Sequence, residues 1–119
     1  MTQVERVDFI NIATRDAERA QAWYHDVLGL PPDAHNPREL SAGQVTLTFW
    51  EPEKEGIAFT PSIGGFAVRV PDVEAARKDL EAKGVEFVGS GDTGVCRMAV
   101  CLDPDGNALI LHRRYKPYE

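Results

Sequence analysis

Four polar side chains on apolar, strand-like segments are the residues of this 119-residue chain best suited to chemistry. They are Asn11, Thr48, Arg69 and His112. An amide such as that of Asn11 needs hydrogen-bond partners when it is buried, and a ligand or an ordered water could supply them. His112 carries an imidazole, which can act as an acid or a base near neutral pH. These groups predict hydrogen bonding to a ligand, with His112 as the candidate catalytic residue, and a purely structural role is the alternative for each.

Motifs of other well-known sites are absent from the sequence. No glycine-rich phosphate loop lies at a strand–helix junction, and no GxSxG turn presents a serine nucleophile. Cys96 and Cys101 lack the CxxC spacing of zinc sites. On one predicted strand they would lie about 17 Å apart on opposite faces, too far for a disulfide. We interpret them as core thiols, although either one could pair with His112 on the neighbouring strand.

Composition and charge indicate one domain, residues 1–119, with an ordinary core. The chain is 43% hydrophobic and has a net charge of −6, which disfavours nucleic acid or an anionic membrane as a partner. The basic run HRRYK at 112–116 is short, and we interpret it as a solvated face. No stretch approaches the roughly 20 apolar residues of a membrane span, and no signal-peptide core is present. We therefore expect a cytoplasmic location.

The elements that position the candidate residues form a repeat. FINIATRDAERA (9–20) aligns with GFAVRVPDVEAA (65–76), so that Asp16 falls on Asp72 at an offset of 56. Each copy reads as a strand, an aspartate placed to cap a helix, and an amphipathic run. The predicted helices span 17–28, with Trp23 on the core-facing stripe, and 73–83. The glycines that follow them, at 29 and 84, suit the left-handed position after a helix.

Strand-like segments follow each predicted helix. After the first come weak extended segments around 33–42 and a strong run at 45–50. After the second come 85–88, 95–102 and 108–113. The element order is therefore βαβββ twice, an α+β fold with module one at about 5–51, a linker at about 52–63 and module two at about 64–115. Before the last strand, DPDGN (103–107) predicts a tight turn, because proline fixes φ and glycine accepts a positive φ.

The two modules resemble those of the vicinal oxygen chelate superfamily. The resemblance is carried by the D-x-E/A-x-A helix starts, by WYHDVLGL (23–30) and by LDPDGNALIL (102–111), and it covers nearly the whole chain. The superfamily includes glyoxalase I, extradiol dioxygenases, fosfomycin-resistance enzymes and bleomycin-binding proteins. The resemblance implies that the mixed sheets curl around a cavity with the helices outside. It also implies a homodimer.

The enzymes of that superfamily hold a divalent metal with four inward-facing residues, usually His, Glu or Gln. The matching positions here are Phe9, Thr48, Gly65 and Ile110. Phe, Gly and Ile have no donor atoms in their side chains, and a divalent ion needs several converging oxygen, nitrogen or thiolate donors. We therefore predict that the usual metal site is absent and that no cofactor is bound.

Strand alternation predicts which side chains face the cavity instead. For the segment 95–102 the alternation leaves two choices, either Cys96 with Met98 or Arg97 with Ala99. The predicted surface is mostly apolar with aromatic walls and a few polar groups, which suits a small, flat organic ligand. The predicted ligand-binding residues are Phe9, Asn11, Thr48, Trp50, Ala67, Arg69, Met98, Ile110 and His112.

Three hypotheses about function remain. The first is a metal-independent small-molecule-binding protein, similar to the antibiotic-sequestering members of the superfamily. The second is an enzyme of the same fold, of lyase, isomerase or dioxygenase type. It would either be metal-free with His112 as the acid–base group or use displaced metal ligands such as Asp8, Glu39 or His112. The third is a non-catalytic dimerising or regulatory module whose cavity is filled by its own side chains, with Phe9 and Ile110 as the plugs.

Overall fold

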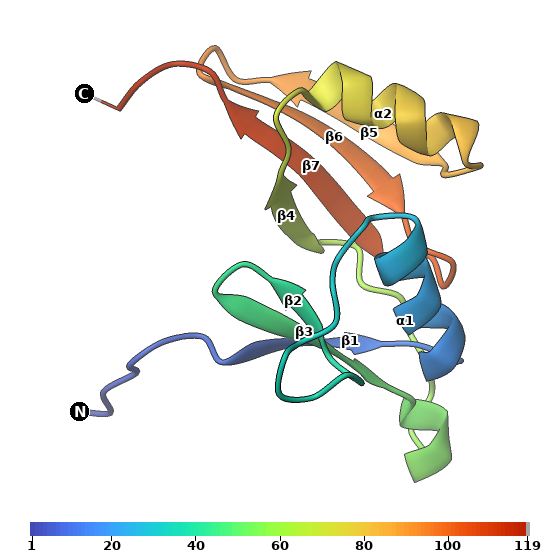
Figure 1. Cartoon of the computed structure of the whole chain (residues 1–119). Helices are drawn as coiled ribbons and strands as arrows, with labels where there is room; N and C mark the ends of the chain where they lie inside the picture. The colour runs from blue at the N-terminus through green and yellow to red at the C-terminus, as the bar shows by residue number, and fades with distance from the viewer. Residues whose placement is uncertain (119) are drawn as a thin grey trace. The chain divides into compact units, whose positions relative to one another are not determined.

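The computed structural model describes residues 1–118 and divides into two compact units. The first unit is Met1–Thr60 and the second is Pro61–Glu119. Each unit combines one α-helix with one mixed β-sheet, and neither sheet closes into a barrel (Figure 1). The predicted α+β class is confirmed. No helix among the described residues is long and apolar enough to cross a membrane.

The first unit is built on a three-stranded sheet in the order β1-β3-β2. Strand β3 pairs in parallel with β1 and antiparallel with β2, so the crossover between the parallel strands β1 and β3 runs through both α1 and β2. The elements in chain order are β1 (Phe9–Ala13), α1 (Ala17–Asp26), β2 (Leu40–Ala42), β3 (Val45–Trp50) and a short 3-10 helix η1 (Pro52–Glu55).

The core of the first unit lies between α1 and the sheet. Ile12, Leu40 and Leu47 are buried, and the Tyr24 ring packs against Phe49 with 5.3 Å between ring centroids. Tyr24 is fully buried, whereas Trp23 is only partly buried. Sequence reasoning placed Trp23 on the core-facing stripe. The helix is rotated so that the neighbouring tyrosine carries most of the burial, and Trp23 packs edge-on against it.

The second unit contains a four-stranded sheet in the order β4-β7-β6-β5. Helix α2 lies across one face of this sheet (Figure 1). Strand β7 pairs in parallel with β4 and antiparallel with β6. The elements in chain order are β4 (Phe66–Arg69), α2 (Val73–Ala82), β5 (Phe87–Asp92), β6 (Cys96–Leu102) and β7 (Ala108–Arg114).

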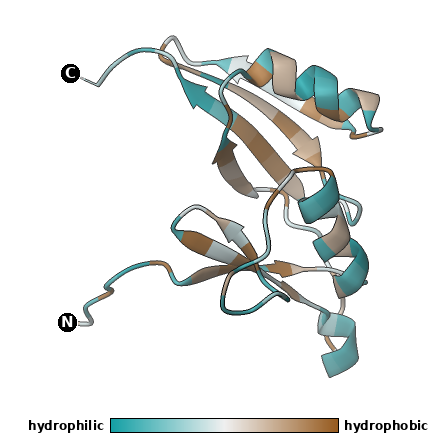
Figure 2. Cartoon of the chain, viewed as in Figure 1, coloured by the Kyte–Doolittle hydropathy of each residue, from teal (hydrophilic) through white to brown (hydrophobic). Residues whose placement is uncertain are grey.

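Alternation along the strands divides the second sheet into a helix-covered face and a helix-free face. The buried side chains Leu80, Ala99, Cys101, Leu109 and Leu111 form the core under α2. Figure 2 shows that β7 changes from hydrophobic to hydrophilic along its length, because its last residues are histidine and arginines. The C-terminal end of β7 is therefore the polar end of this sheet.

The predicted helix starts are confirmed at both copies of the repeat. Each helix has ten residues, and each begins directly after its capping aspartate, at Ala17 and at Val73. Asp16 Oδ1 accepts a hydrogen bond from the backbone N–H of Arg19 at 3.1 Å, and Asp72 Oδ1 accepts one from that of Ala75 at 3.0 Å. Such caps satisfy N–H groups that the first turn of a helix leaves without partners. The local sequence signal was sufficient to locate both helices.

The first unit lacks one strand of the predicted βαβββ order. In the segment around 33–42 only β2 forms, and before it a single bridge joins Pro32 to Leu40. Prolines have no N–H to donate to a strand ladder. Asp33 further bends the chain, because its carboxylate accepts hydrogen bonds from the backbone N–H groups of His35 and Asn36. The prediction of three strands after the first helix was therefore wrong by one strand.

Candidate functional site

The helix-free face of the second sheet carries five of the predicted ligand-binding residues. The leucines at alternate positions of β7 are buried under α2, so Ile110 and His112 point to the opposite face. The register pairs Ala67 with Ile110 and Arg69 with His112. Met98 pairs with His112 from the other side. The structure therefore brings these five residues together on one surface within one unit.

Two rows of side chains cross this face. One row is Ala67, Ile110 and Val100, and the next is Arg69, His112 and Met98. The first row is apolar, and the second places two nitrogen-bearing groups beside a thioether. Among residues 1–118, the side chains of Arg69 and His112 have no hydrogen-bond or ion-pair partner. The open choice for β6 is thereby settled: Met98 and Cys96 lie on this face, and Arg97 and Ala99 lie on the other.

The helix-free face of the first sheet carries the other four predicted residues. Asn11 and Thr48 are register partners, and the Thr48 hydroxyl donates to Asn11 Oδ1 at 2.9 Å. The indole N–H of Trp50 donates to the carboxylate of Glu55 in η1. Phe9 remains 54% exposed in this unit. The polar groups named here are thus engaged in hydrogen bonds, and the Phe9 ring is an exposed apolar group of this face.

The four positions that match the metal ligands of the superfamily do not fit a metal ion. Phe9, Gly65 and Ile110 provide no donor, and Thr48 provides one hydroxyl that already donates a hydrogen bond. Gly65 has φ +71°, and a Cβ at this position would lie 2.1 Å from the carbonyl oxygen of Ala108. A ligating side chain therefore could not stand there without a change of backbone. Among residues 1–118, no group of three or more His, Cys, Asp or Glu side chains is placed to hold a metal.

The residues suggested as displaced metal ligands are committed to other contacts or lie apart in the fold. Asp8 forms an exposed ion pair with Arg6 at 2.9 Å. Glu39 accepts a hydrogen bond from the Thr46 hydroxyl at 3.2 Å. His112 belongs to the second unit, where no carboxylate shares its row on the sheet. These positions do not build a common donor set within either unit.

The two cysteines lie on opposite faces of β6, as their spacing predicted, and both are free thiols. Cys101 is fully buried under α2, and this burial, with a smaller contribution from the nearby Asp103 carboxylate, raises its pKa to about 11. A thiol with so high a pKa is a poor nucleophile at neutral pH. It also faces away from His112, so only Cys96 shares a face with the imidazole.

The DPDGN turn is a buried hydrogen-bonded structure rather than part of a reactive site. The Asp103 carboxylate accepts hydrogen bonds from the backbone N–H groups of Asp105 and Asn107, both at 2.9 Å, and from the Asn107 amide at 3.0 Å. Asn107 Oδ1 accepts one from the N–H of Ser62 at 2.8 Å. Gly106 has the positive φ, +85°, that the turn prediction required. This network fastens the start of the second unit to β7.

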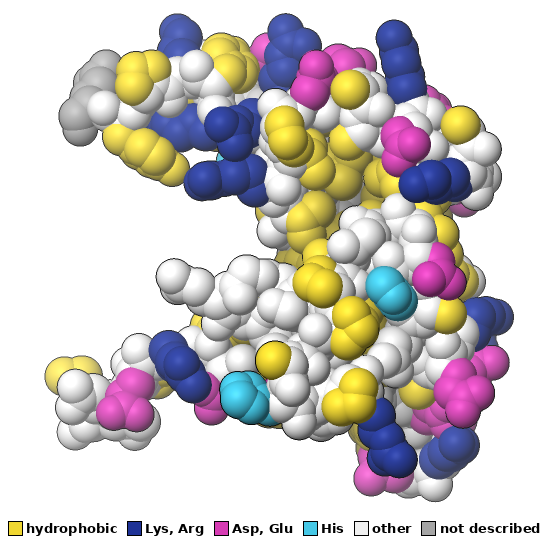
Figure 3. Space-filling model, viewed as in Figure 1, with side chains coloured by type: hydrophobic (Ala, Val, Ile, Leu, Met, Phe, Trp, Pro, Cys, Tyr) yellow, Lys and Arg dark blue, Asp and Glu magenta, His cyan; other side chains and the backbone are white. Residues whose placement is uncertain are grey.

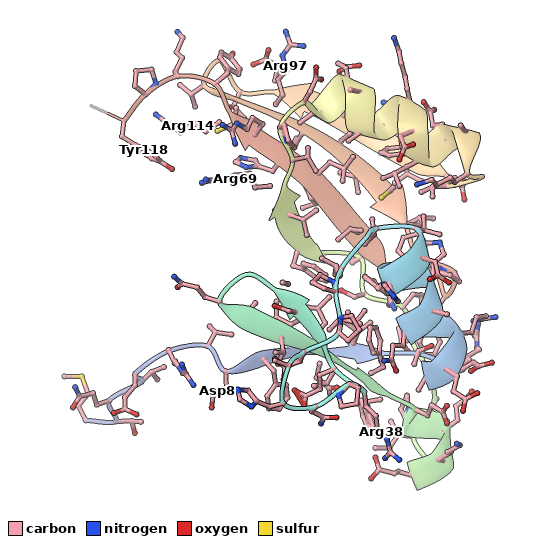
Figure 4. The ribbon with its side chains drawn as sticks, in the orientation of Figure 1. Asp8, Arg38, Arg69, Arg97, Arg114 and Tyr118 are labelled. Carbon is pink, nitrogen blue, oxygen red and sulfur yellow. The ribbon has the colours of Figure 1, made fainter. Side chains whose placement is uncertain are left out.

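A surface pocket that sequence reasoning missed adjoins the second sheet. It has a volume of about 370 Å³ and is lined by Arg69 and residues 113–118. Lys and Arg side chains gather over this end of β7 (Figure 3), and Figure 4 shows Arg69, Arg114 and Tyr118 close together. We had interpreted the run at 112–116 as a solvated face. Strand alternation is the sequence signal that could have located this pocket, because Arg114 lies two residues after His112 and therefore points to the same face of the sheet.

The protein is an α+β protein made from a duplicated strand–helix–strand motif. In each copy a helix begins at an aspartate cap and packs on a mixed sheet. Each repeat pairs its first strand in parallel with its last. The chain belongs to the Glyoxalase/Bleomycin resistance protein/Dioxygenase superfamily, whose family model matches residues 6–111. The resemblance inferred from the helix starts and the turn is thereby confirmed.

Solved structures agree with this assignment. A superfamily member from Sphaerobacter thermophilus is 23% identical, with a TM-score of 0.75, and the match covers 92% of this chain and 97% of that one. The antibiotic-binding protein TnmS3 from Streptomyces sp. CB03234 is 24% identical, with a TM-score of 0.71 and coverages of 96% and 99%. A lactoylglutathione lyase from Agrobacterium tumefaciens is 17% identical, with a TM-score of 0.75 and coverages of 92% and 94%. At these identities the likeness shows the fold alone. A comparison with curated protein sequences finds no significant match.

Proposed function

We propose that this protein binds a small, flat organic ligand without the metal ion that the enzymes of its superfamily use. The observation that carries the proposal is the chemistry of the helix-free faces. The four positions that match the metal ligands hold Phe9, Thr48, Gly65 and Ile110. The second sheet presents an apolar row beside Arg69 and His112, whose side chains have no partner among the described residues. Such a surface holds a ligand through apolar contact and a few hydrogen bonds.

The helix-free face of the second sheet is the stronger candidate surface. Its apolar row offers Ile110 and Val100, both partly exposed, as a floor on which a ring can lie. Arg69 and His112 border this floor and are free to donate hydrogen bonds to a ligand. The antibiotic-binding protein among the similar structures supports the class of function, since it shares the fold. A lactoylglutathione lyase shares the fold as well, so an enzymatic role for His112 is the second candidate, although the imidazole has no hydrogen-bond partner among residues 1–118 to orient it.

The test is a fluorescence and calorimetry screen of planar aromatic compounds against the full chain. Compounds that bind should keep their affinity after the protein has been treated with a chelator and dialysed. Replacing Ile110 with Glu places a carboxylate on the apolar floor, which should weaken binding at least about tenfold because that charge loses hydration under a ligand. The matched control is Val88→Glu, which adds the same charge at an exposed position of β5.

The helix-free face of the first sheet is tested separately by Trp50→Ala. Loss of a stacking surface worth roughly 1 kcal/mol should weaken binding about fivefold if Trp50 contacts the ligand, as strand alternation predicts. Two results would overturn the proposal: affinity that disappears with the chelator and returns with a divalent metal, or hits that bind Ile110→Glu and wild type equally. The homodimer expected from the resemblance stays a prediction, which light scattering at micromolar concentration checks.

A further inference from the structure

We propose that the pocket at the C-terminal end of β7 binds the anionic group of a planar aromatic ligand. The inference rests on the proposed function, to which it adds the charge of the ligand and the residues that recognise it. The pocket measures about 370 Å³. This volume lies within the usual range for small-molecule sites, about 300–1,000 Å³. Arg69, which lines the pocket, also belongs to the polar row of the helix-free face, so the pocket continues that surface.

The pocket is positively charged in a chain whose net charge is −6. Its lining includes Arg69, Arg113, Arg114 and Lys116 and no carboxylate among the described residues. Asp92 is nearby; its carboxylate accepts the hydroxyl hydrogen bond of Tyr115, which lowers the pKa of Asp92 and keeps it ionised, so it offsets part of this positive charge. Among the described residues the cations of the lining outnumber this carboxylate, and the remaining positive charge attracts an anion and raises its local concentration.

Arg114 is the best placed of these cations. Its guanidinium lies 4.1 Å from the ring centroid of Tyr118, and Nη2 donates to the carbonyl oxygen of Pro117 at 3.3 Å. Its Nε is buried and has no hydrogen-bond partner among residues 1–118. A buried N–H group normally has a partner, so this one points to an acceptor that a ligand would bring.

Arg69 and Arg114 lie on the same face of the sheet. Arg69 is the register partner of His112, and Arg114 stands two residues further along β7, which preserves the parity. Figure 4 shows both side chains beside Tyr118. Two guanidinium groups can bind the oxygens of one carboxylate through paired hydrogen bonds, and both can stack on a ring.

The aromatic part of the ligand follows from the neighbours of these arginines. The Tyr118 ring and the planes of the guanidinium groups offer stacking surfaces. The apolar row with Ile110 lies on the same face for the remainder of a ring system. We therefore assign to this site a flat aromatic compound that carries a carboxylate or a similar anionic group.

The experiment compares 2-naphthoate with the neutral 2-naphthamide, which has nearly the same shape, by isothermal titration of the full chain. Naphthoate should bind about ten- to a hundredfold tighter than the amide, because hydrogen bonds to charged groups are the stronger kind. Arg69→Gln and Arg114→Gln should each remove most of this preference and leave the affinity for the amide within about twofold. Tyr118→Leu should weaken both compounds by about fivefold, since it removes a stacking surface.

Arg97→Gln is the matched control, because Arg97 lies on β6 and points to the opposite face (Figure 4). It makes the same change of charge and should keep the preference for naphthoate. If naphthoate and naphthamide bind equally, or if Arg97→Gln has the same effect as Arg114→Gln, the anion site is refuted and the proposed small-molecule function stands. If inorganic phosphate competes as strongly as naphthoate, the aromatic part of the assignment is refuted. If no planar aromatic compound binds, the proposed function fails and this inference fails with it.

Discussion

The two units of this protein repeat one design and use it differently. Both begin a ten-residue helix at an aspartate cap, and both pair their first strand in parallel with their last. On the helix-free face of the first sheet, Thr48 bonds to Asn11 and Trp50 bonds to Glu55. On the corresponding face of the second, Arg69 and His112 have no partner among residues 1–118. Duplication supplies the same scaffold twice, and the binding function that we propose is assigned to the copy whose polar groups lack partners among the described residues.

The extra strand of the second unit makes this difference possible. This extra strand is β5, which lies beyond β6 at the sheet edge, whereas β6, which supplies Met98 and Val100 to the helix-free face, corresponds to β2. In the first unit the corresponding position beyond β2 is taken by a proline-rich segment that makes only one bridge. A wider sheet offers a wider surface, and the second unit therefore has room for an apolar floor and a charged border.

The sequence provides a separate probe for each unit. Both tryptophans, Trp23 and Trp50, belong to the first unit, and both cysteines, Cys96 and Cys101, belong to the second. Tryptophan emission therefore reports unfolding of the first unit. Labelling of Cys101, which is buried and has a raised pKa of about 11, reports unfolding of the second. The following predictions use these two probes.

The largest expected effect is that of Gly65→Ala in the second unit. Gly65 has φ +71°, and the added Cβ would lie 2.1 Å from the Ala108 carbonyl oxygen, so β4 and β7 must separate locally. We expect a loss of about 3–5 kcal/mol in unfolding free energy from left-handed strain and overpacking together. Cys101 should then be labelled at a lower denaturant concentration.

Gly43→Ala is the control for this prediction in the first unit. Gly43 has φ +79°, but no atom lies within 4 Å of an added Cβ, so only the strain of about 1–2 kcal/mol remains. Its effect should appear in the tryptophan emission. Equal losses from the two substitutions would contradict the close approach at Gly65.

The next effect is that of Asp103→Ala. This change removes the acceptor for two backbone N–H groups and for the Asn107 amide inside a buried turn. Leaving such donors unsatisfied should cost about 2–3 kcal/mol, measured by denaturant unfolding with Cys101 labelling.

The counterpart is Asp33→Ala, because Asp33 also accepts hydrogen bonds from two backbone N–H groups but in an exposed loop of the first unit. Water can replace those bonds, so the loss should stay below about 1 kcal/mol. A larger loss of unfolding free energy from Asp33→Ala than from Asp103→Ala would contradict this prediction.

How much of the fold and of the candidate site could be predicted from the sequence depends on how far apart in the chain the interacting residues lie. The helix starts at Asp16 and Asp72 were predictable, because a cap and the N–H that it binds lie three residues apart. The prediction that Gly65 and Ile110 offer no metal donor follows from their residue types once the resemblance has placed them at the ligand positions of the superfamily. The face of Met98 needed the pairing of β6 with β7, which alternation alone does not provide.

The pocket around Arg114 lay beyond sequence reasoning for a related reason. The chain after β7 is held by non-local bonds: the Tyr115 N–H donates to the Val95 carbonyl at 2.9 Å, and the Tyr115 hydroxyl donates to Asp92. These contacts bring Tyr118 back beside Arg114. A basic run that reads as a solvated face thus becomes the lining of a cavity.

The smallest effect concerns acid and distinguishes the starts of the two helices. In the first unit Glu51 accepts a hydrogen bond from the backbone N–H of Ala17 at 2.9 Å, and this bond, aided by the side chain of Lys54, lowers the pKa of Glu51 from its ordinary value of 4.5. A carboxylate whose pKa is lower in the folded state stabilises that state above its unfolded pKa, and the stabilisation disappears as the pH falls through the lower, folded value. The first unit should therefore lose stability between about pH 5 and pH 3, followed by tryptophan emission in denaturant. Glu51→Gln should reduce the pH dependence of the first unit in this range and leave Cys101 labelling unchanged. If Glu51→Gln shows the same pH profile as the wild type, this carboxylate does not stabilise the start of α1.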